Sequence, residues 1–169
     1  MSHNPYETRD LLRKEMPFDP VKRAKGYNSH PSGVETVQVT EHMTTMLGTA
    51  VKYVWRRGAK GALVQDLEKA LWCFEREHER IRLPGSVTLW DGSGWRAHAL
   101  DVALADGGTV LGQCMKALLL CPHSIGLVEA LDRCIEATKT ELLRLEDPAY
   151  LAKEKALREP LVVTKAVRE

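Results

Sequence analysis

The sequence predicts a mainly α-helical protein, in which an antiparallel helical hairpin over about residues 34–82 packs with a C-terminal helical bundle. Apolar residues recur at three-residue and four-residue steps through most of the chain, and glycine or proline pairs separate these stretches. One segment, near 86–96, has the composition of a short strand or hairpin. A chain of 169 residues can bury a core without disulfides or metals.

Three segments follow from these patterns. Residues 1–27 mix charges with prolines and predict an N-terminal arm. Residues 28–83 form a helical module, and residues 84–169 form a C-terminal helical region packed on it as one unit.

The module begins with a predicted capping box. Ser32 and Glu35 have the S-x-x-E spacing in which each side chain bonds the backbone N–H of the other residue, so we expect a helix to start there. Thr40 interrupts or recaps it.

Two longer helices make the hairpin. The first runs from Met43 to Arg57, and the second from Val64 to Ile81, each with an apolar stripe. Gly58 and Gly61 are typical of the helix stop and tight turn between them.

The C-terminal region predicts further helices over residues 97–105, 109–120 and about 123–146. Asp147 and Pro148 suit the N-cap and first turn of a last helix that reaches Arg158.

Composition narrows the possible functions. The 24 basic and 23 acidic residues nearly cancel and leave no basic tail for binding nucleic acid through bulk charge. No apolar run is long enough to cross a bilayer or to serve as a secretion signal. The four cysteines lack metal-site spacing, so we expect reduced, buried thiols in a cytoplasmic protein.

The densest chemical pattern is the stretch from Lys52 to Gly61, with four cations and two aromatics. Cations near a helix C-terminus interact favourably with the helix dipole, which is one explanation of the pattern. The functional alternative is that Lys52, Arg56 and Lys60 bind phosphate while Tyr53 or Trp55 stacks on a base. Both readings stay open.

Other polar residues give weaker signals. His30 lies before a proline, where it either contacts phosphate or braces the loop. No P-loop is present, and the carboxylates lack the E-x-x-E pattern of helical nucleoside triphosphate pyrophosphohydrolases. Asp66 is an isolated acidic candidate, and we predict no metal site formed by the protein alone.

Several blocks resemble a known family. They are Tyr27-Asn28-x-His30-Pro31-Ser32-Gly33-Val34-Glu35, Thr40-Glu41-His42-Met43, Leu47-Gly48-x-Ala50-Val51-Lys52-Tyr53-Val54-Trp55-Arg56, Asp66-Leu67-x-Lys69-Ala70-x-Trp72 and Glu75-Arg76-Glu77. In this order they resemble a family of small bacteriophage and prophage proteins that includes the Walker-less nucleotide kinase of a T-odd coliphage. The likeness covers about a third of the chain. Thr49 replaces a usual asparagine, and Cys73 replaces a usual tyrosine.

The resemblance implies a phage-encoded nucleotide-binding protein in an infected bacterium. Its kinase member implies phosphorylation of deoxynucleoside monophosphates, with ATP or a dNTP and Mg²⁺ as the associated cofactors. Carried over by position, Asp66 or Glu35 would position the attacking oxygen. The implied nucleotide or phosphate contacts are His30, Gly33, Gly48, Lys52, Tyr53, Arg56, Lys60 and Lys69.

Two alternatives use the same residues without catalysis. The protein would then sequester a nucleotide signal, or inhibit or adapt a host protein. A long apolar stripe and the aromatics Trp90 and Trp95, expected to be exposed, also predict a homo-oligomer.

Overall fold

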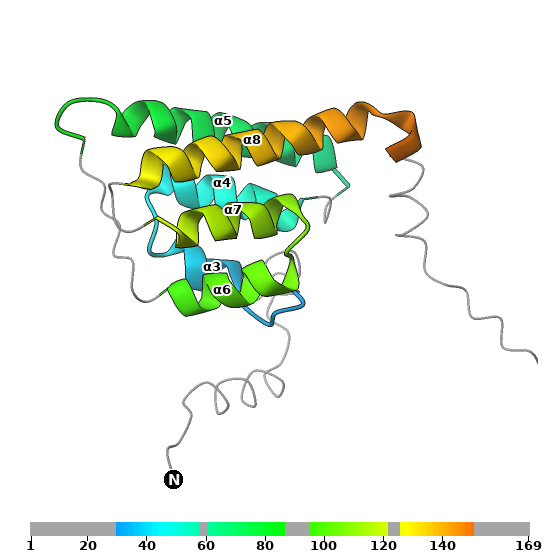
Figure 1. The fold of residues 1–169 in the computed structure, drawn as a ribbon, viewed down its shortest axis with the longest axis horizontal. Coiled ribbons are helices and arrows are strands. Elements are labelled where there is room, and N and C mark those ends of the chain that lie inside the picture. The colour runs from blue at the N-terminus through cyan, green and yellow to red at the C-terminus, as the bar shows by residue number, and fades with distance from the viewer. Residues whose placement is uncertain (1–29, 58–60, 87–94, 122–125, 151–169) are drawn as a thin grey trace, which may run out of the picture.

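The computed structural model describes residues 30–57, 61–86, 95–121 and 126–150. Within these ranges every regular element is a helix, as predicted (Figure 1). The helices are α3 (Thr36–Thr40), α4 (Thr45–Arg56), α5 (Leu63–Ile81), α6 (Arg96–Ala105), α7 (Val110–Leu119) and α8 (Leu127–Glu146). The predicted N-terminal arm, Lys60, most of the predicted strand segment and Trp90 lie outside the described residues.

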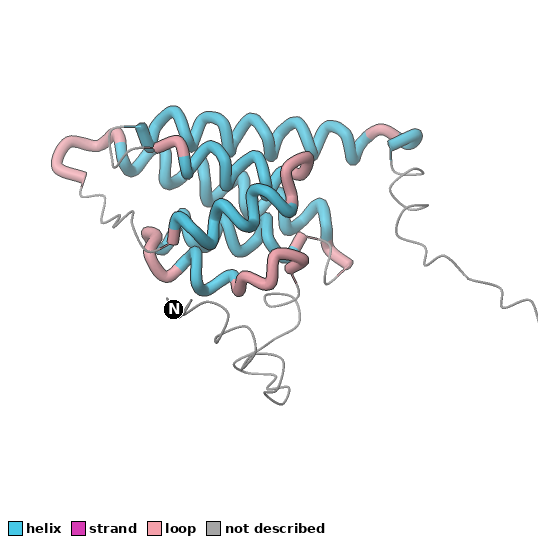
Figure 2. The backbone as a smooth tube through the Cα atoms, turned by 60° about the horizontal axis from the view of Figure 1, so that its bottom comes forward, coloured by secondary structure: helices cyan, strands magenta, loops and turns pink. Residues whose placement is uncertain are grey.

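The predicted hairpin consists of α4 and α5, which pack along their length. Helix α8 lies along α5, and α7 contacts both α8 and α4. The short α3 and α6 complete the other end, where α3 contacts α4 and α6 and α6 packs on α7 (Figures 1 and 2). The C-terminal helices therefore pack on the hairpin, and one hydrophobic core runs through all of them.

Most of the predicted core stripe on α4 is confirmed. Leu47, Ala50, Val51, Val54 and Trp55 are buried, and the Thr44 hydroxyl caps the helix by accepting the N–H of Leu47. The Cβ that an alanine would add at Gly48 would lie 3.3 Å from the Thr40 carbonyl oxygen, so this glycine lets the end of α3 approach α4.

Two local predictions are wrong. The capping box at the start of α3 joins Glu35 to Gln38, because Glu35 is the N-cap, whereas Ser32 bonds His30 in the preceding turn. Trp95 is fully buried at the start of α6 and so cannot cover an exposed contact between subunits.

The cysteines match the prediction of buried, free thiols. Cys73, Cys114, Cys121 and Cys134 are all buried and none is in a disulfide. Asp147 also caps as predicted, since its Oδ1 accepts the N–H of Ala149 at 2.9 Å and residues 148–150 are helical. No helix among the described residues is long and apolar enough to span a membrane.

A buried carboxylate joins α5 to the start of α4. Glu77 is fully buried, and its Oε1 accepts the Thr44 hydroxyl at 2.6 Å and Arg80 Nη2 at 2.7 Å, while Oε2 accepts Arg80 Nε at 2.8 Å. Burial alone would raise the pKa of Glu77. The hydrogen bonds from Arg80 and Thr44 and the charge of Arg80 outweigh burial and hold this pKa below its ordinary value of 4.5.

The turn between α6 and α7 depends on close packing of backbone. Thr109 caps α7 by accepting the N–H of Gly112, and Gly112 lies directly against the backbone of Asp106. A Cβ at position 112 would overlap the Asp106 carbonyl oxygen, whereas a Cβ at Gly108 would meet nothing.

We predict that Gly112→Ala lowers the free energy of unfolding by about 3 kcal/mol or more, because the backbone of Asp106 must move. Gly108 lies in the same turn, two residues after Asp106. Gly108→Ala should change the free energy of unfolding by less than about 0.5 kcal/mol. Urea denaturation followed by circular dichroism measures both, and equal stabilities for the two variants would contradict the packing described.

Glu77→Gln should lower the free energy of unfolding at pH 7 by about 1–3 kcal/mol, because an amide cannot accept both bonds from Arg80. The folded pKa of Glu77 lies below the unfolded one, so its stabilisation is present above the unfolded pKa and is lost as pH falls through the folded pKa. The variant should therefore show a shallower loss of stability in acid.

Glu79→Gln serves as the control, since Glu79 pairs with Arg76 on the exposed side of the same helix. It should leave both the stability at pH 7 and its acid dependence unchanged. Matching pH profiles for the two variants would show that Glu77 does not carry the effect.

Candidate functional site

Helix α4 presents two chemically different faces at its C-terminal end. Tyr53 and Trp55 are two residues apart, so their side chains point about 200° apart around the helix axis. Tyr53 is partly exposed beside α5, whereas Trp55 is buried with its ring centroid 5.0 Å from that of His30. The predicted site residues therefore separate into two groups.

The first group surrounds Tyr53 and is called the Tyr53 cluster. It comprises Lys52, Tyr53 and Arg56 from α4, and Asp66 and Lys69 from α5. The Arg56 guanidinium carbon lies 4.7 Å from the centroid of the Tyr53 ring, and the ammonium nitrogens of Lys52 and Lys69 lie 5.6 and 5.7 Å from it. Three cations thus gather at one aromatic ring.

Asp66 holds one of these cations in place. Its Oδ1 accepts Arg56 Nη2 at 2.8 Å, and the Asp66 side chain is almost completely buried. Its Oδ2 is also buried but has no hydrogen-bond partner among the described residues. Asp66 therefore differs from Glu77, the other buried carboxylate of α5, whose two oxygens both accept hydrogen bonds.

Unlike Arg56, the two lysines of the cluster are not paired with a carboxylate of the described residues. Neither Lys52 nor Lys69 forms an ion pair with any residue in the described ranges, and both are partly exposed. Lys52 also influences the interior, because burial raises the pKa of the Cys73 thiol and the Lys52 charge partly opposes that rise. With one carboxylate against three cations, the Tyr53 cluster carries a local positive charge on a nearly neutral protein.

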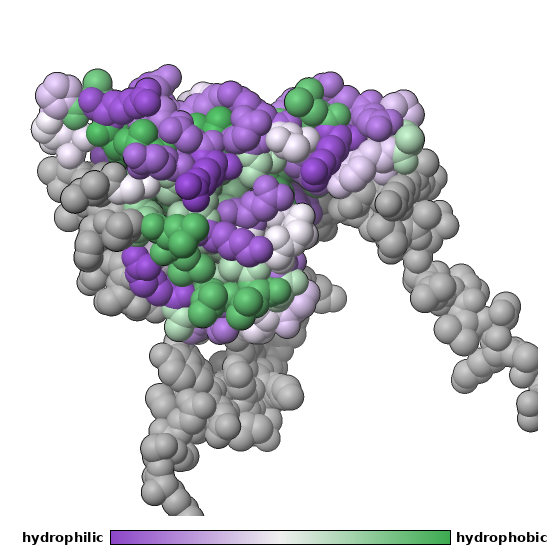
Figure 3. Space-filling model, viewed as in Figure 1, coloured by the Kyte–Doolittle hydropathy of each residue, from purple (hydrophilic) through white to green (hydrophobic). Residues whose placement is uncertain are grey.

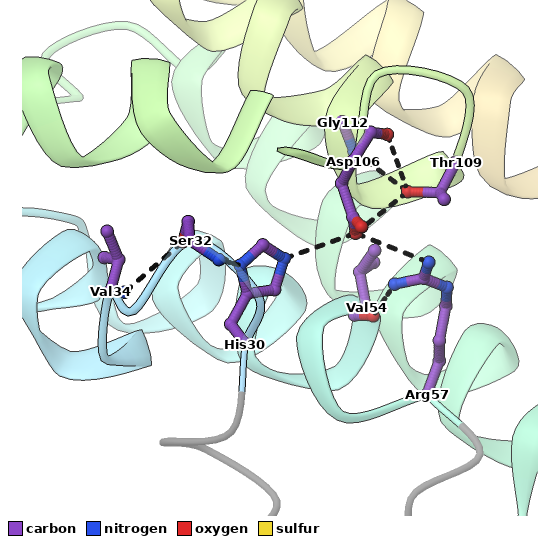
Figure 4. Close-up of polar contacts among 8 residues, drawn as sticks. All are labelled: His30, Ser32, Val34, Val54, Arg57, Asp106, Thr109 and Gly112. Atoms are coloured by element: carbon purple, nitrogen blue, oxygen red, sulfur yellow. Dashed lines mark hydrogen bonds and ion pairs between the residues drawn. The ribbon is translucent and has the colours of Figure 1, made fainter. Parts of the chain in front are cut away.

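The second group, called the Asp106 cluster, joins His30, Arg57, Asp106 and Thr109 (Figure 4) and lies on the side of α4 where Trp55 packs against His30. Asp106 Oδ2 accepts the Thr109 hydroxyl at 3.1 Å and lies 3.4 Å from His30 Nε2 and 3.6 Å from Arg57 Nη2. Arg57 also bonds the Val54 carbonyl, at the end of α4. Asp106 thus ties the loop before α3 and the end of α4 to the turn between α6 and α7.

Ser32, His30 and Asp106 lie in the order hydroxyl, imidazole and carboxylate, as in a Ser-His-Asp catalytic triad. The Ser32 hydroxyl lies 2.7 Å from His30 Nδ1, but the same nitrogen accepts the Ser32 backbone N–H, and the hydroxyl accepts the Val34 N–H. The neighbouring N–H of Gly33 bonds the His30 carbonyl, so these bonds close a turn and offer no donor pair to an oxyanion. These hydrogen bonds brace the loop before α3, which is the structural one of the two roles considered for His30 from the sequence.

The remaining predicted site residues that the structure describes lie in a turn, at a helix cap and at a helix contact. Gly33 has a φ of 73° in the turn after His30, and Glu35 caps α3. Gly48 faces the end of α3. The structure therefore brings together five of the predicted residues, Lys52, Tyr53, Arg56, Asp66 and Lys69, and does not bring His30, Gly33, Gly48 or Glu35 into contact with them.

Sequence reasoning missed Asp106. It stands before Gly107 and Gly108, a pattern that predicts a turn, and nothing local indicates its distant partners His30 and Arg57. Among the residues that the structure describes, no group of three or more histidine, cysteine, aspartate or glutamate side chains could hold a metal ion.

Comparison with known proteins gives one result. Residues 21–75, about a third of the chain, match a family described as a protein of unknown function (DUF3310). No curated protein and no solved structure matches the chain significantly. The matched segment contains all of the Tyr53 cluster and none of α6, α7 or α8, so the chain is similar to DUF3310 over the part that carries the candidate site.

Proposed function

We propose that the protein binds a nucleotide at the Tyr53 cluster. The observation that carries the proposal is the convergence of Lys52, Arg56 and Lys69 on one partly exposed tyrosine ring, with a single carboxylate to balance them. Mutual repulsion disfavours such an arrangement in the free protein, and a bound anion relieves it. The site favours a ligand that combines negative charge with a flat ring.

Each side chain has a distinct part in this proposal. Lys52 and Lys69, which lack ion-pair partners among the described residues, supply point charges to a phosphate group. Tyr53 offers its ring to a base, while buried Trp55 is unavailable for stacking. Arg56 contributes charge from a fixed position, because Asp66 already holds one end of its guanidinium.

A finer proposal is phosphoryl transfer to a deoxynucleoside monophosphate, as the resemblance to a phage kinase family implies. Phosphoryl transfer chiefly requires positioning and charge stabilisation, with an acceptor for the proton of the attacking hydroxyl. Asp66 Oδ2 accepts no hydrogen bond from the described residues, so it could accept that proton. Because this oxygen is buried, a hydroxyl could reach it only after the side chains above it move. The Glu35 side chain takes part in the capping box of α3, so we do not assign it this role.

The alternative is a non-catalytic protein that sequesters a nucleotide, or that occupies a host protein. Sequestration needs the cations and the ring but no proton acceptor. In that case Asp66 serves to hold Arg56 against Tyr53, which its Oδ1 already does.

We predict that a nucleoside mono- or triphosphate raises the melting temperature of the full chain, and that Lys69→Gln reduces the rise. A ligand at 100 times its Kd stabilises by about 2.7 kcal/mol, or roughly 5–10 °C for a chain of this size. Losing one charged contact should weaken binding about tenfold and remove about 1.4 kcal/mol of that stabilisation. Differential scanning fluorimetry with and without Mg²⁺ measures the shift.

Lys139→Gln is the control, because it removes one charge at a half-exposed position of α8, where Lys139 pairs with Glu75 and not with a residue of the Tyr53 cluster. It should leave the nucleotide shift unchanged. No shift with any nucleotide, or equal losses in the two variants, would rule out binding at the Tyr53 cluster. If nucleotides bind, transfer of labelled phosphate that is lost in Asp66→Asn while binding persists would favour the kinase over sequestration.

A further inference from the structure

Helix α6 carries an apolar stripe on its outer side. Ala97, Leu100, Asp101 and Leu104 are exposed and follow the i, i+3, i+4, i+7 spacing of one helix face. Leu100 is 49% exposed and Leu104 is 73% exposed, while the opposite side of α6 is buried in the core. Two neighbouring leucines this exposed form an apolar patch on the protomer, and contiguous patches of this kind mark interaction sites.

A groove of about 360 Å³ lies beside this stripe, between α7 and α8. The small side chains of Ala117 and Ala137 make it hollow, and the 70% exposed Leu120 stands at its edge. Lys116 and Arg133 add positive charge to its rim, against the single carboxylate of Glu136. The groove is therefore apolar inside and net positive at its border.

The stripe and the groove belong to one face of the molecule. Figure 3 shows apolar side chains gathered over α6 and α7 on the same face as α8, whose outer surface is mostly polar. Helix α7 packs on both α6 and α8, so it separates the stripe from the groove by a single helix. Two surfaces so close together can both be covered by one partner.

The charges on the two surfaces are complementary. Asp101, within the stripe, and Arg133, at the groove, form no ion pair with any described residue. The stripe is apolar with a negative centre, and the groove is apolar with a positive border. A helix that fits this groove has the features of α6 itself.

We propose that a second copy of this chain covers this face, with α6 of each protomer seated in the α7–α8 groove of the other. Such a contact is isologous: each leucine stripe fills the partner's groove, and Asp101 of each protomer meets Arg133 and Lys116 of its partner. A twofold contact of this kind uses both surfaces at once and closes as a dimer. It lies outside the Tyr53 cluster and does not depend on nucleotide binding.

Sedimentation equilibrium of the full chain across the micromolar range tests the proposal. The parent protein should have the mass of a dimer, and Leu104→Glu should raise the dimer Kd by about 30-fold or more, the effect of losing a central interface residue. Leu83→Glu, at another largely exposed leucine, after α5, should leave the Kd within about twofold. Because Leu104 is mostly exposed in the protomer, the variant should keep its helical circular dichroism.

Charge exchange provides a second, independent measurement. Asp101→Arg and Arg133→Asp should each weaken the dimer on the order of tenfold, and the two together in one chain should restore it, because the pair is then reversed in both contacts. A monomeric parent protein would overturn the proposal. So would a dimer that is insensitive to Leu104→Glu, or single charge variants whose losses simply add in the double variant.

Discussion

Pairing of two buried carboxylates against α4 is the constraint on which the helical hairpin depends. Burying a charge costs several kcal/mol unless it is paired and hydrogen-bonded, so Asp66 and Glu77 must both face partners. The two residues are eleven positions apart on α5, about three turns, and therefore lie on the same side of the helix. Glu77 meets Thr44 at the start of α4, and Asp66 meets Arg56 at its end. This double pairing fixes the register of α4 against α5.

The two pairs are chemically unequal, and this inequality points to the candidate site. Glu77 is shielded by full hydrogen bonding and keeps its charge through Arg80 and Thr44, as expected of a structural residue. Asp66 leaves one oxygen without a described partner and fixes an arginine at the Tyr53 ring, which two lysines without an ion pair in the described ranges also approach. On the other side of α4, the Asp106 cluster anchors the helix to the α6–α7 turn. A helix held from both sides can present its cations in a fixed geometry, which favours anion binding because little ordering remains to be done.

The sequence predicted the helices well because their signal is local. Periodic apolar residues placed α4, α5, α6 and α7 within a few residues of their bounds, and Thr40 did end α3. Predictions failed where a residue's contacts come from segments far away in the sequence. Trp95 follows a glycine-rich stretch that suggests exposure, yet the core of the bundle covers it, and Asp106 finds His30 and Arg57 through tertiary contacts. Of the candidate site, the α4–α5 residues came together because helical spacing and the hairpin determine their positions, whereas His30 and Glu35 depended on turn geometry that spacing does not fix.

We propose that the Asp66 end of the hairpin binds a nucleotide and that the Glu77 end does not. A ¹H–¹⁵N NMR titration of the full chain with a deoxynucleoside monophosphate and with ATP tests it most directly. The account predicts shifts at the amides of Lys52, Tyr53 and Lys69 and at the side-chain Nε–H of Arg56, with Thr44 and Glu77 unchanged. Shifts confined to the Asp106 cluster, or none at all at saturating nucleotide, would contradict it.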